Sequence, residues 1–226
     1  MEKEIILTPE ELYYMGTLLQ AKYIDYAYVA AMGDIQQRRG IYESRSREGL
    51  AEKGILMEDF SGGLEVDEDA RRLLEPVFFG TLESSVDVAQ PDGEGGKRHW
   101  GRRFHFYEGR ITATSMTDGG ICLEAADEGM LQTWIAGLLP AGYAAQERFI
   151  RVREIHRSRI NRIIVVKSSR AGERAYVNLY AQMEGAVFRE LEDGRAERLT
   201  REKFCLEVYR GLKGSVTGSG FAGADR

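Results

Sequence analysis

The stretch from Arg102 to Ala125 restricts the fold of this 226-residue chain more than any other. It contains three short runs of aromatic and β-branched residues, separated by turns at Gly109 and Gly119. In the first run, Phe104 and Phe106 stand at alternate positions, and this period of two is typical of a half-buried antiparallel strand. Glycine supplies the positive φ that tight hairpins need. The stretch therefore predicts a three-stranded β-meander.

Helix-forming segments and further strands repeat this plan along the chain. Thr8, Pro9 and Glu11 match a capping box with proline at the first helical position, so a helix is expected to begin there. The apolar run 163–166 predicts a buried strand, and Thr200 is placed to cap a last helix. A meander followed by a helix thus occurs twice, which predicts an α+β fold.

We expect a single α+β domain over residues 1–212, with a central antiparallel β-sheet built from two meanders and flanked by helical subdomains. Its N-terminal half covers residues 1–142 and its C-terminal half residues 143–212, which leaves room for quasi-twofold symmetry. Identity between the halves is too weak to show a duplication. Residues 213–226 are rich in glycine and serine, and they predict a flexible C-terminal tail.

Charge and composition argue against several classes of protein. The formal net charge is −5, so the field of the whole molecule does not favour nucleic acid or an anionic membrane. No apolar run approaches the roughly 20 residues of a transmembrane helix, and the start lacks the basic and apolar regions of a signal peptide. Cys122 and Cys205 lie far apart in apolar runs, as reduced cysteines of a cytosolic protein do. We expect a cytoplasmic protein without membrane insertion.

The sequence shows no motif for catalysis, a cofactor or a metal. The histidines His99, His105 and His156 do not stand at metal-ligand spacing. Residues 218–223 match the G-x-G-x-x-G pattern of dinucleotide sites, but no strand precedes them and no helix can follow. The acidic run 58–69 lacks the ligand order of an EF-hand. We therefore predict a protein that is not an enzyme, with no catalytic residue, cofactor or metal, and the sequence assigns no partner-binding residue.

Two arginine-rich segments support an alternative that binds nucleic acid. Residues 148–162 hold six arginines and His156, which suit either a solvated sheet face or a phosphate or acidic partner. Between Arg38 and Leu56, a short helix ending at Gly54 is typical of a winged-helix element. The acidic run 58–69 follows it directly and argues against DNA, because readers of DNA usually present basic surfaces.

Several short motifs, and the order of the predicted elements, resemble one known family. The motifs are Leu7–Leu12 (LTPEEL), Leu50–Ile55 (LAEKGI), Leu74–Phe79 (LEPVFF) and Met130–Pro140 (MLQTWIAGLLP). Over residues 5–212 the chain is similar to the EspG-like proteins of type VII (ESX) secretion clusters, including Firmicutes proteins encoded in similar clusters.

This resemblance implies a sheet between two helical subdomains, and a non-catalytic cytosolic chaperone or adaptor. Its partner would be a helical secreted substrate protein whose apolar tip is masked before export. Such proteins have no fixed binding motif, so no binding residue is carried over. By physical reasoning, the region Gln90–Met116 offers a sheet face able to hold a helical hairpin, with Pro91–Lys97 as a clasp. Phe104, Phe106 and Ile111 are expected in the core.

Two hypotheses about function therefore stay open at this point. The first is a chaperone or adaptor for a helical substrate of a type VII system, which performs no chemistry. The alternative is a winged-helix-type transcriptional regulator or another nucleic-acid-binding protein. An antiparallel sheet with open edges is also able to pair with a second copy, so a homodimer is compatible with either hypothesis.

Overall fold

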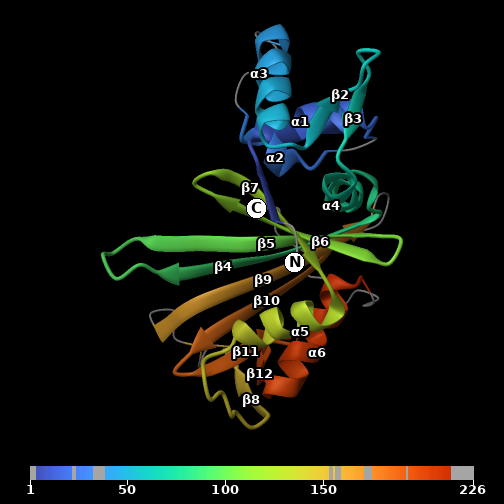
Figure 1. Ribbon diagram of the computed structural model, residues 1–226. Helices are drawn as coiled ribbons and strands as arrows, with labels where there is room; N and C mark the ends of the chain where they lie inside the picture. The colour runs from blue at the N-terminus through green and yellow to red at the C-terminus, as the bar shows by residue number, and fades with distance from the viewer. Residues whose placement is uncertain are drawn as a thin grey trace. The chain divides into compact units, whose positions relative to one another are not determined.

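A computed structural model describes residues 4–21, 24–32, 39–152, 155, 159–170, 175–191 and 193–214. The strands are β1 (Glu4–Leu7), β2 (Leu56–Glu58), β3 (Leu64–Val66), β4 (Leu82–Pro91), β5 (Lys97–Tyr107), β6 (Arg110–Thr117), β7 (Gly120–Ala126), β8 (Arg148–Arg151), β9 (Ile160–Arg170), β10 (Tyr176–Met183), β11 (Ala186–Glu190) and β12 (Arg195–Arg198). The helices are α1 (Pro9–Leu18), α2 (Tyr26–Ala30), α3 (Arg39–Glu52), α4 (Glu68–Phe79), α5 (Glu128–Gly137) and α6 (Arg201–Leu212). Figure 1 shows these helices and antiparallel strands, which confirm the predicted α+β class.

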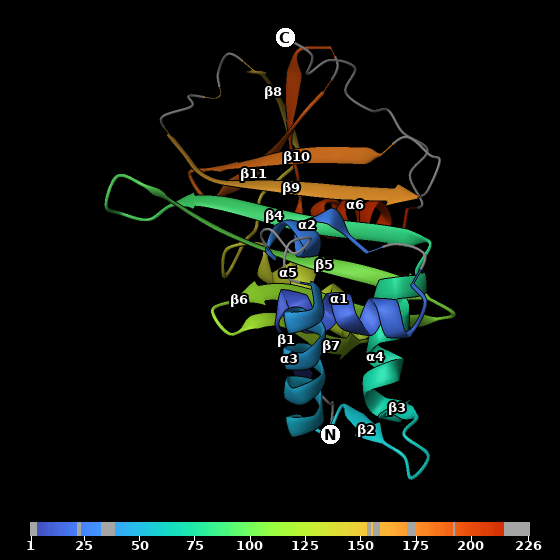
Figure 2. The same ribbon diagram turned by 90° about the horizontal axis from the view of Figure 1, so that it is seen from above.

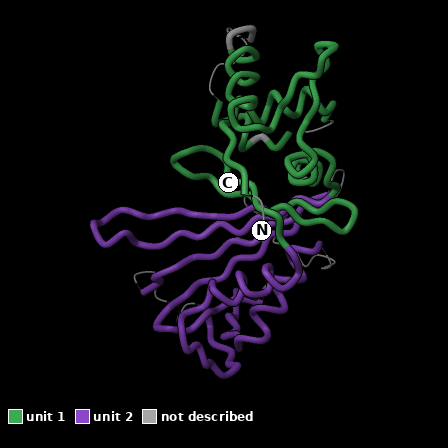
Figure 3. The backbone as a smooth tube through the Cα atoms, viewed as in Figure 1, with its two compact units in different colours: residues 1–81, 105–126 green, residues 82–104, 127–226 purple. Residues whose placement is uncertain are grey.

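The chain forms two compact units that are interleaved along the sequence (Figure 3). The first contains residues 1–81 and 105–126, and the second contains residues 82–104 and 127–226. The halves expected from the sequence, 1–142 and 143–212, are consecutive instead. The interleaving arises because β4 pairs with β9 of the C-terminal part, a long-range pairing that the order of elements does not reveal.

In the first unit the strands follow the order β1-β7-β6, and the last residues of β5 come next. The turn between β5 and β6 is the expected one, with positive φ at Glu108 (46°) and Gly109 (76°). The next turn differs from the prediction, because Gly120 (φ 128°) takes the positive φ in place of Gly119. A Cβ atom at Gly120 would press on the backbone of Leu7 in β1, so glycine is needed for the pairing of β1 with β7.

Helix α1 begins as the sequence predicts. The Glu11 amide donates to Thr8 Oγ1 (3.2 Å), and the Thr8 amide donates to Glu11 Oε2 (2.7 Å), which completes the capping box. Leu12 and Met15 of α1 are buried in one apolar core together with Leu7 of β1. Leu12 and Met15 therefore lie on the face of α1 that packs into the core.

The helix predicted to end at Gly54 is present in the first unit as α3. Helix α3 ends in a turn where Gly54 has a φ of 67°, and strands β2 and β3 then pair as a hairpin with Leu56 opposite Val66. Helices α1, α2 and α3 thus precede a two-stranded hairpin. Arg38, where the expected segment began, lies outside the described residues.

In the second unit the first part of β5 is followed by the order β4-β9-β10-β11-β12-β8. Helices α5 and α6 pack against one another, and α6 contacts β4, β9 and β10 (Figure 1). The expected strand at 163–166 lies inside β9, but only Ile164 and Val166 are fully buried. Ile163 and Val165, which alternate with them, are partly exposed. The run therefore has one packed side and one accessible side.

Other features predicted from the sequence concern the cysteines, the C-terminal tail and membrane-spanning helices. Cys122 and Cys205 are free thiols, and Cys122 is buried. Helix α6 ends at Leu212, while residues 215–226, which include the 218–223 glycine pattern, lie outside the described residues. In the part of the chain that the structure describes, no helix is long and apolar enough to cross a membrane.

Candidate protein-binding surface

One side of the sheet in the second unit is the helix face, defined here as the side of β4, β9 and β10 that contacts α6. Tyr180 of β10 packs edge-on against Phe204 of α6, with ring centroids 5.1 Å apart. Ser84 Oγ of β4 donates to the Leu212 carbonyl (2.6 Å). Because alternate residues of a strand point to opposite sides, these contacts and the strand registers fix the direction of the side chains at 84–89 of β4, 163–168 of β9 and 176–182 of β10.

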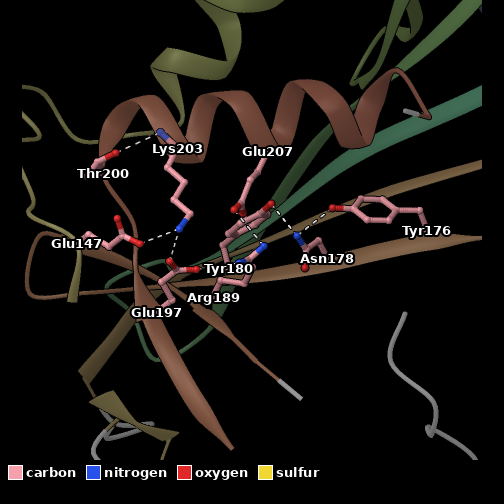
Figure 4. A network of polar contacts seen from close by, with 9 residues as sticks. All are labelled: Glu147, Tyr176, Asn178, Tyr180, Arg189, Glu197, Thr200, Lys203 and Glu207. Atoms are coloured by element: carbon pink, nitrogen blue, oxygen red, sulfur yellow. Dashed lines mark hydrogen bonds and ion pairs between the residues drawn. The ribbon is translucent and has the colours of Figure 1, made fainter. Parts of the chain in front are cut away.

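A polar network on the helix face joins α6 to the strands (Figure 4). Lys203 of α6 contacts Glu147 (2.8 Å) and Glu197, and Arg189 contacts Glu197 (2.8 Å) and Glu207 (3.0 Å). The Asn178 amide donates to the hydroxyls of Tyr176 (3.0 Å) and Tyr180 (2.8 Å). These charges are engaged with one another inside the unit, so the network stabilises the packing of α6.

Within the network, the pKa values of some groups are raised and that of another is lowered. Burial raises the pKa of the Glu207 carboxyl and of the Tyr180 hydroxyl above their ordinary values. Burial also works against ionisation of Glu197, but hydrogen bonds from Lys203 and Arg189 outweigh it and hold the pKa of Glu197 below its ordinary value. Glu197 is thus a buried carboxylate that depends on two cations.

The opposite side of the same strands is the open face. The strand registers place Asp87, Val165 and Leu179 in one row across β4, β9 and β10. The open face consists of Ser85, Asp87 and Ala89 of β4, Ile163, Val165 and Lys167 of β9, and Val177, Leu179 and Ala181 of β10. These residues form a largely apolar surface. At one side of it, Lys167 Nζ forms an ion pair with Asp87 Oδ2 (3.6 Å).

Apolar side chains of the open face remain accessible to solvent. Val177 is 39% exposed and Leu179 is 42% exposed, although both belong to a central strand. Among its described residues, the second unit has two helices, α5 and α6. Both lie on the side of the helix face, since α6 occupies that face and α5 packs against α6. Exposed apolar surface rimmed by polar residues is typical of a protein interaction site.

The hairpin of β4 and β5 extends from one end of this surface. In both views it reaches further than the neighbouring strand β9 (Figures 1 and 2). Every residue from Pro91 to Trp100 is exposed. Asp92 Oδ1 accepts from the amides of Glu94 (2.9 Å) and Gly96 (2.9 Å), which gives the tip a defined shape. The segment predicted as a clasp is therefore an ordered and accessible hairpin tip.

The region Gln90–Met116, which was predicted to hold a helical hairpin, contains both buried and exposed side chains. Phe104 packs against Trp134 of α5 (centroids 5.2 Å apart) and is buried, as is Ile111, so both are core residues as expected. Phe106 is only half-buried. His105 is buried, with its Nε2 atom 3.0 Å from the Tyr28 hydroxyl, so it is a hydrogen-bonded core histidine.

The described arginines of segment 148–162 do not gather at one site. Arg162 donates to the Leu138 carbonyl (3.0 Å), and Arg159 pairs with Glu184 (2.9 Å). Glu147, which directly precedes this segment, pairs with Lys203 of α6. Arg153, His156 and Arg157 lie outside the described residues. A continuous phosphate-binding stripe is therefore not formed by the described arginines.

Charges on the winged-helix-like element are unfavourable for binding DNA. Arg47 of α3 pairs with Glu58 of β2 (2.5 Å), and Lys53 pairs with Glu11 (2.5 Å). The hairpin 54–66 contains carboxylates but no lysine or arginine. A wing that approaches phosphates normally carries basic side chains.

One group of potential metal ligands was not foreseen from the sequence. Cys122 Sγ lies 3.2 Å from Glu4 Oε1 and 3.9 Å from Glu124 Oε1, on the paired strands β1 and β7. Glu4 is far from Cys122 and Glu124 in the sequence, and only the pairing of β1 with β7 brings it beside them. A thiol that donates to neighbouring carboxylates accounts for this geometry.

The open face was also missed by sequence reasoning, although a signal for it exists. Residues 176–180 alternate between polar or aromatic side chains and the apolar Val177 and Leu179, and the run 163–166 is apolar at every position. No family model and no curated protein matches the chain, so the surface is interpreted from its own residues.

Proposed function

We propose that the protein is a non-catalytic cytosolic chaperone or adaptor that binds a helical substrate protein of a type VII (ESX) secretion system through its open face. The observation that carries this proposal is the exposed apolar surface around Val177 and Leu179, in the middle of a sheet. The resemblance of the chain to the EspG-like family supplies the class of partner. It also agrees with an α+β fold rich in antiparallel strands.

The dimensions of the open face suit a helix. Neighbouring strands lie about 4.8 Å apart, so the three strands β4, β9 and β10 span roughly 10 Å, about the diameter of an α-helix. Along β10, Val177 and Leu179 are separated by about 7 Å, slightly more than one helical turn. A helix with an apolar stripe would therefore contact all three strands at once.

The hairpin tip adds a polar rim to this surface. Lys97 and Arg98 follow the tip loop and are exposed, while Asp92 and Glu94 lie in the loop itself. Such a mixed rim contributes mainly to orientation and rate of association, since exposed charges are screened by salt. We infer that the hairpin closes over one end of the bound helix.

Substitution of Leu179 by aspartate tests the proposal. Completing the burial of this leucine in a complex contributes about 1 kcal/mol, and a carboxylate in its place must also be desolvated. The affinity should therefore fall at least tenfold, since about 1.4 kcal/mol corresponds to a factor of ten. The assay is co-expression with each small helical secreted protein encoded by neighbouring genes, followed by size-exclusion chromatography of the complex.

Leu206→Asp is the matched control. Leu206 is 46% exposed, but it lies on helix α6, away from the open face. The proposal expects this variant to retain the complex and Leu179→Asp to lose it, with unchanged unfolding midpoints. Equal effects of the two substitutions, or no complex with any helical substrate, would remove the proposal.

A winged-helix-type nucleic-acid-binding protein is the alternative. It is favoured by the order of α1, α2 and α3 before the β2–β3 hairpin, and it is opposed by the carboxylates of that hairpin. This alternative requires DNA binding that weakens steeply with salt, because phosphate contacts release counterions. An electrophoretic mobility shift assay at low ionic strength distinguishes the two functions.

A further inference from the structure

A second feature lies at the other end of the sheet in the second unit. Strands β10, β11, β12 and β8 border a cleft of about 320 Å³. Arg148 and Arg198 line it together with Ile150, Met183 and Phe188. Its size is at the lower end of the range for small-ligand sites. The cleft thus combines two guanidinium groups with an apolar floor.

The two arginines are placed in an arrangement that is unfavourable without an anion. Arg198 of β12 stands directly opposite Arg148 of β8 in the antiparallel register. Like charges at directly opposed positions of two strands destabilise the pairing. Among the described residues, no carboxylate pairs with either guanidinium, whereas Arg189 on the next strand contacts two. The described part of the chain therefore gives this pair no counter-charge of the kind that it gives Arg189.

The hydrogen bonding of Arg198 is also incomplete. The Nε atom of Arg198 is buried and has no acceptor among the residues that the structure describes. A buried donor without an acceptor costs free energy that a bound anion can recover. The acid that borders the cleft, Glu184, pairs with Arg159 at 2.9 Å, so its carboxylate is already engaged.

The apolar residues that line the cleft indicate the chemistry of the uncharged part of the ligand. Met183, Ala186 and Phe188 are buried, and Ile150 and Ile155 pack against them in one apolar cluster. Only a small part of this floor is accessible, and that part offers contact to hydrocarbon but no hydrogen bonds to the several oxygens of a phosphate. A planar carboxylate matches the donor geometry of guanidinium groups.

We propose that this cleft binds a carboxylate carried on an apolar body, held between Arg148 and Arg198 with the hydrocarbon against Met183 and Phe188. The site needs neither the open face nor a helical partner, so it goes beyond the function proposed above. The carboxylate can belong to a free small acid or to an acidic side chain flanked by apolar residues of a peptide.

Titration with two matched pairs of probes tests this site. The first pair is octanoate and octanamide, and the second is acetyl-Leu-Glu-Leu-amide and acetyl-Leu-Gln-Leu-amide. Chemical shifts of the arginine Nε–Hε groups in the intact protein report binding. We expect saturable shifts with at least one carboxylate and at least tenfold weaker binding of its amide, because a charged acceptor strengthens the hydrogen bonds. Binding of octanoate identifies a small-molecule site, and binding of the Glu peptide alone identifies a side-chain site.

Arginine variants locate the binding. Arg148→Gln and Arg198→Gln should each weaken the carboxylate about tenfold or more, while Arg195→Gln should not, since Arg195 lies on β12 but is paired with Asp193 (2.6 Å). Without ligand, Arg148→Gln should also raise the unfolding midpoint, because it removes the like-charge pair. The inference is overturned if neither carboxylate binds, if amides bind equally well, or if Arg195→Gln has the same effect.

Discussion

Removing Arg189 should destabilise the second unit in a way that depends on pH. Arg189 lies between two carboxylates, with its guanidinium 2.8 Å from Glu197 and 3.0 Å from Glu207. The side chain of Glu197 is only 3% exposed and that of Glu207 17%, so solvent cannot replace the lost partner. The substitution Arg189→Met keeps the aliphatic length and removes the charge.

The expected loss in the free energy of unfolding follows from these contacts. Removing one partner of a buried ion pair costs about 3–5 kcal/mol, because the other charge is left buried and uncompensated. Glu197 keeps its contact with Lys203, and Glu207 can take up a proton, so the loss should lie near the lower end. We expect the free energy of unfolding at neutral pH to fall by about 3 kcal/mol.

The change of this stability loss with pH tests the role of Glu207. Burial raises the pKa of Glu207, and the loss of Arg189 should raise it further, because Arg189 is a positive charge that lowers it. A carboxyl whose folded pKa is raised favours the folded state at low pH, and it loses that contribution as pH rises through the folded pKa. The deficit of Arg189→Met relative to the wild type should therefore be larger at pH 7.5 than at about pH 5.

Urea unfolding at the two pH values measures this prediction, with m-values checked for two-state behaviour. The control is Arg195→Met, whose ion pair with Asp193 is about half exposed and should change stability by less than about 1 kcal/mol. Adding Glu207→Gln to Arg189→Met should recover part of the loss. A deficit below about 1 kcal/mol, or one that does not change with pH, would refute the reasoning.

Two local contacts in the first unit give further predictions. Thr8→Ala removes the capping hydroxyl of α1 and should lower the free energy of unfolding by about 1 kcal/mol; an unchanged urea midpoint would contradict the role of the capping box. Tyr28→Phe removes a buried hydroxyl that contacts His105 and Thr114, and it should cost about 1–3 kcal/mol, because buried polar atoms lose a partner. Thr114→Val added to Tyr28→Phe should cost less than the sum of the two single changes, and strict additivity would argue against a shared network.

Features set by neighbours in the chain could be predicted from the sequence. The capping box at Thr8, the turn at Gly109 and the left-handed residue Gly54 all depend on contacts within a few residues. The α+β class also followed from local patterns, because the period of apolar residues reports the type of element that can bury them. These interactions form wherever the segment lies in the fold.

The binding surfaces were decided by tertiary structure. The run 163–166 is apolar on both sides, so its sequence does not indicate that Ile164 and Val166 face α6 while Val165 lies on the open face. The opposition of Arg148 and Arg198 likewise depends on the pairing of β8 with β12. Strand pairing and register are settled by which packing buries the most apolar surface while satisfying the backbone, and this choice involves residues far apart in the chain.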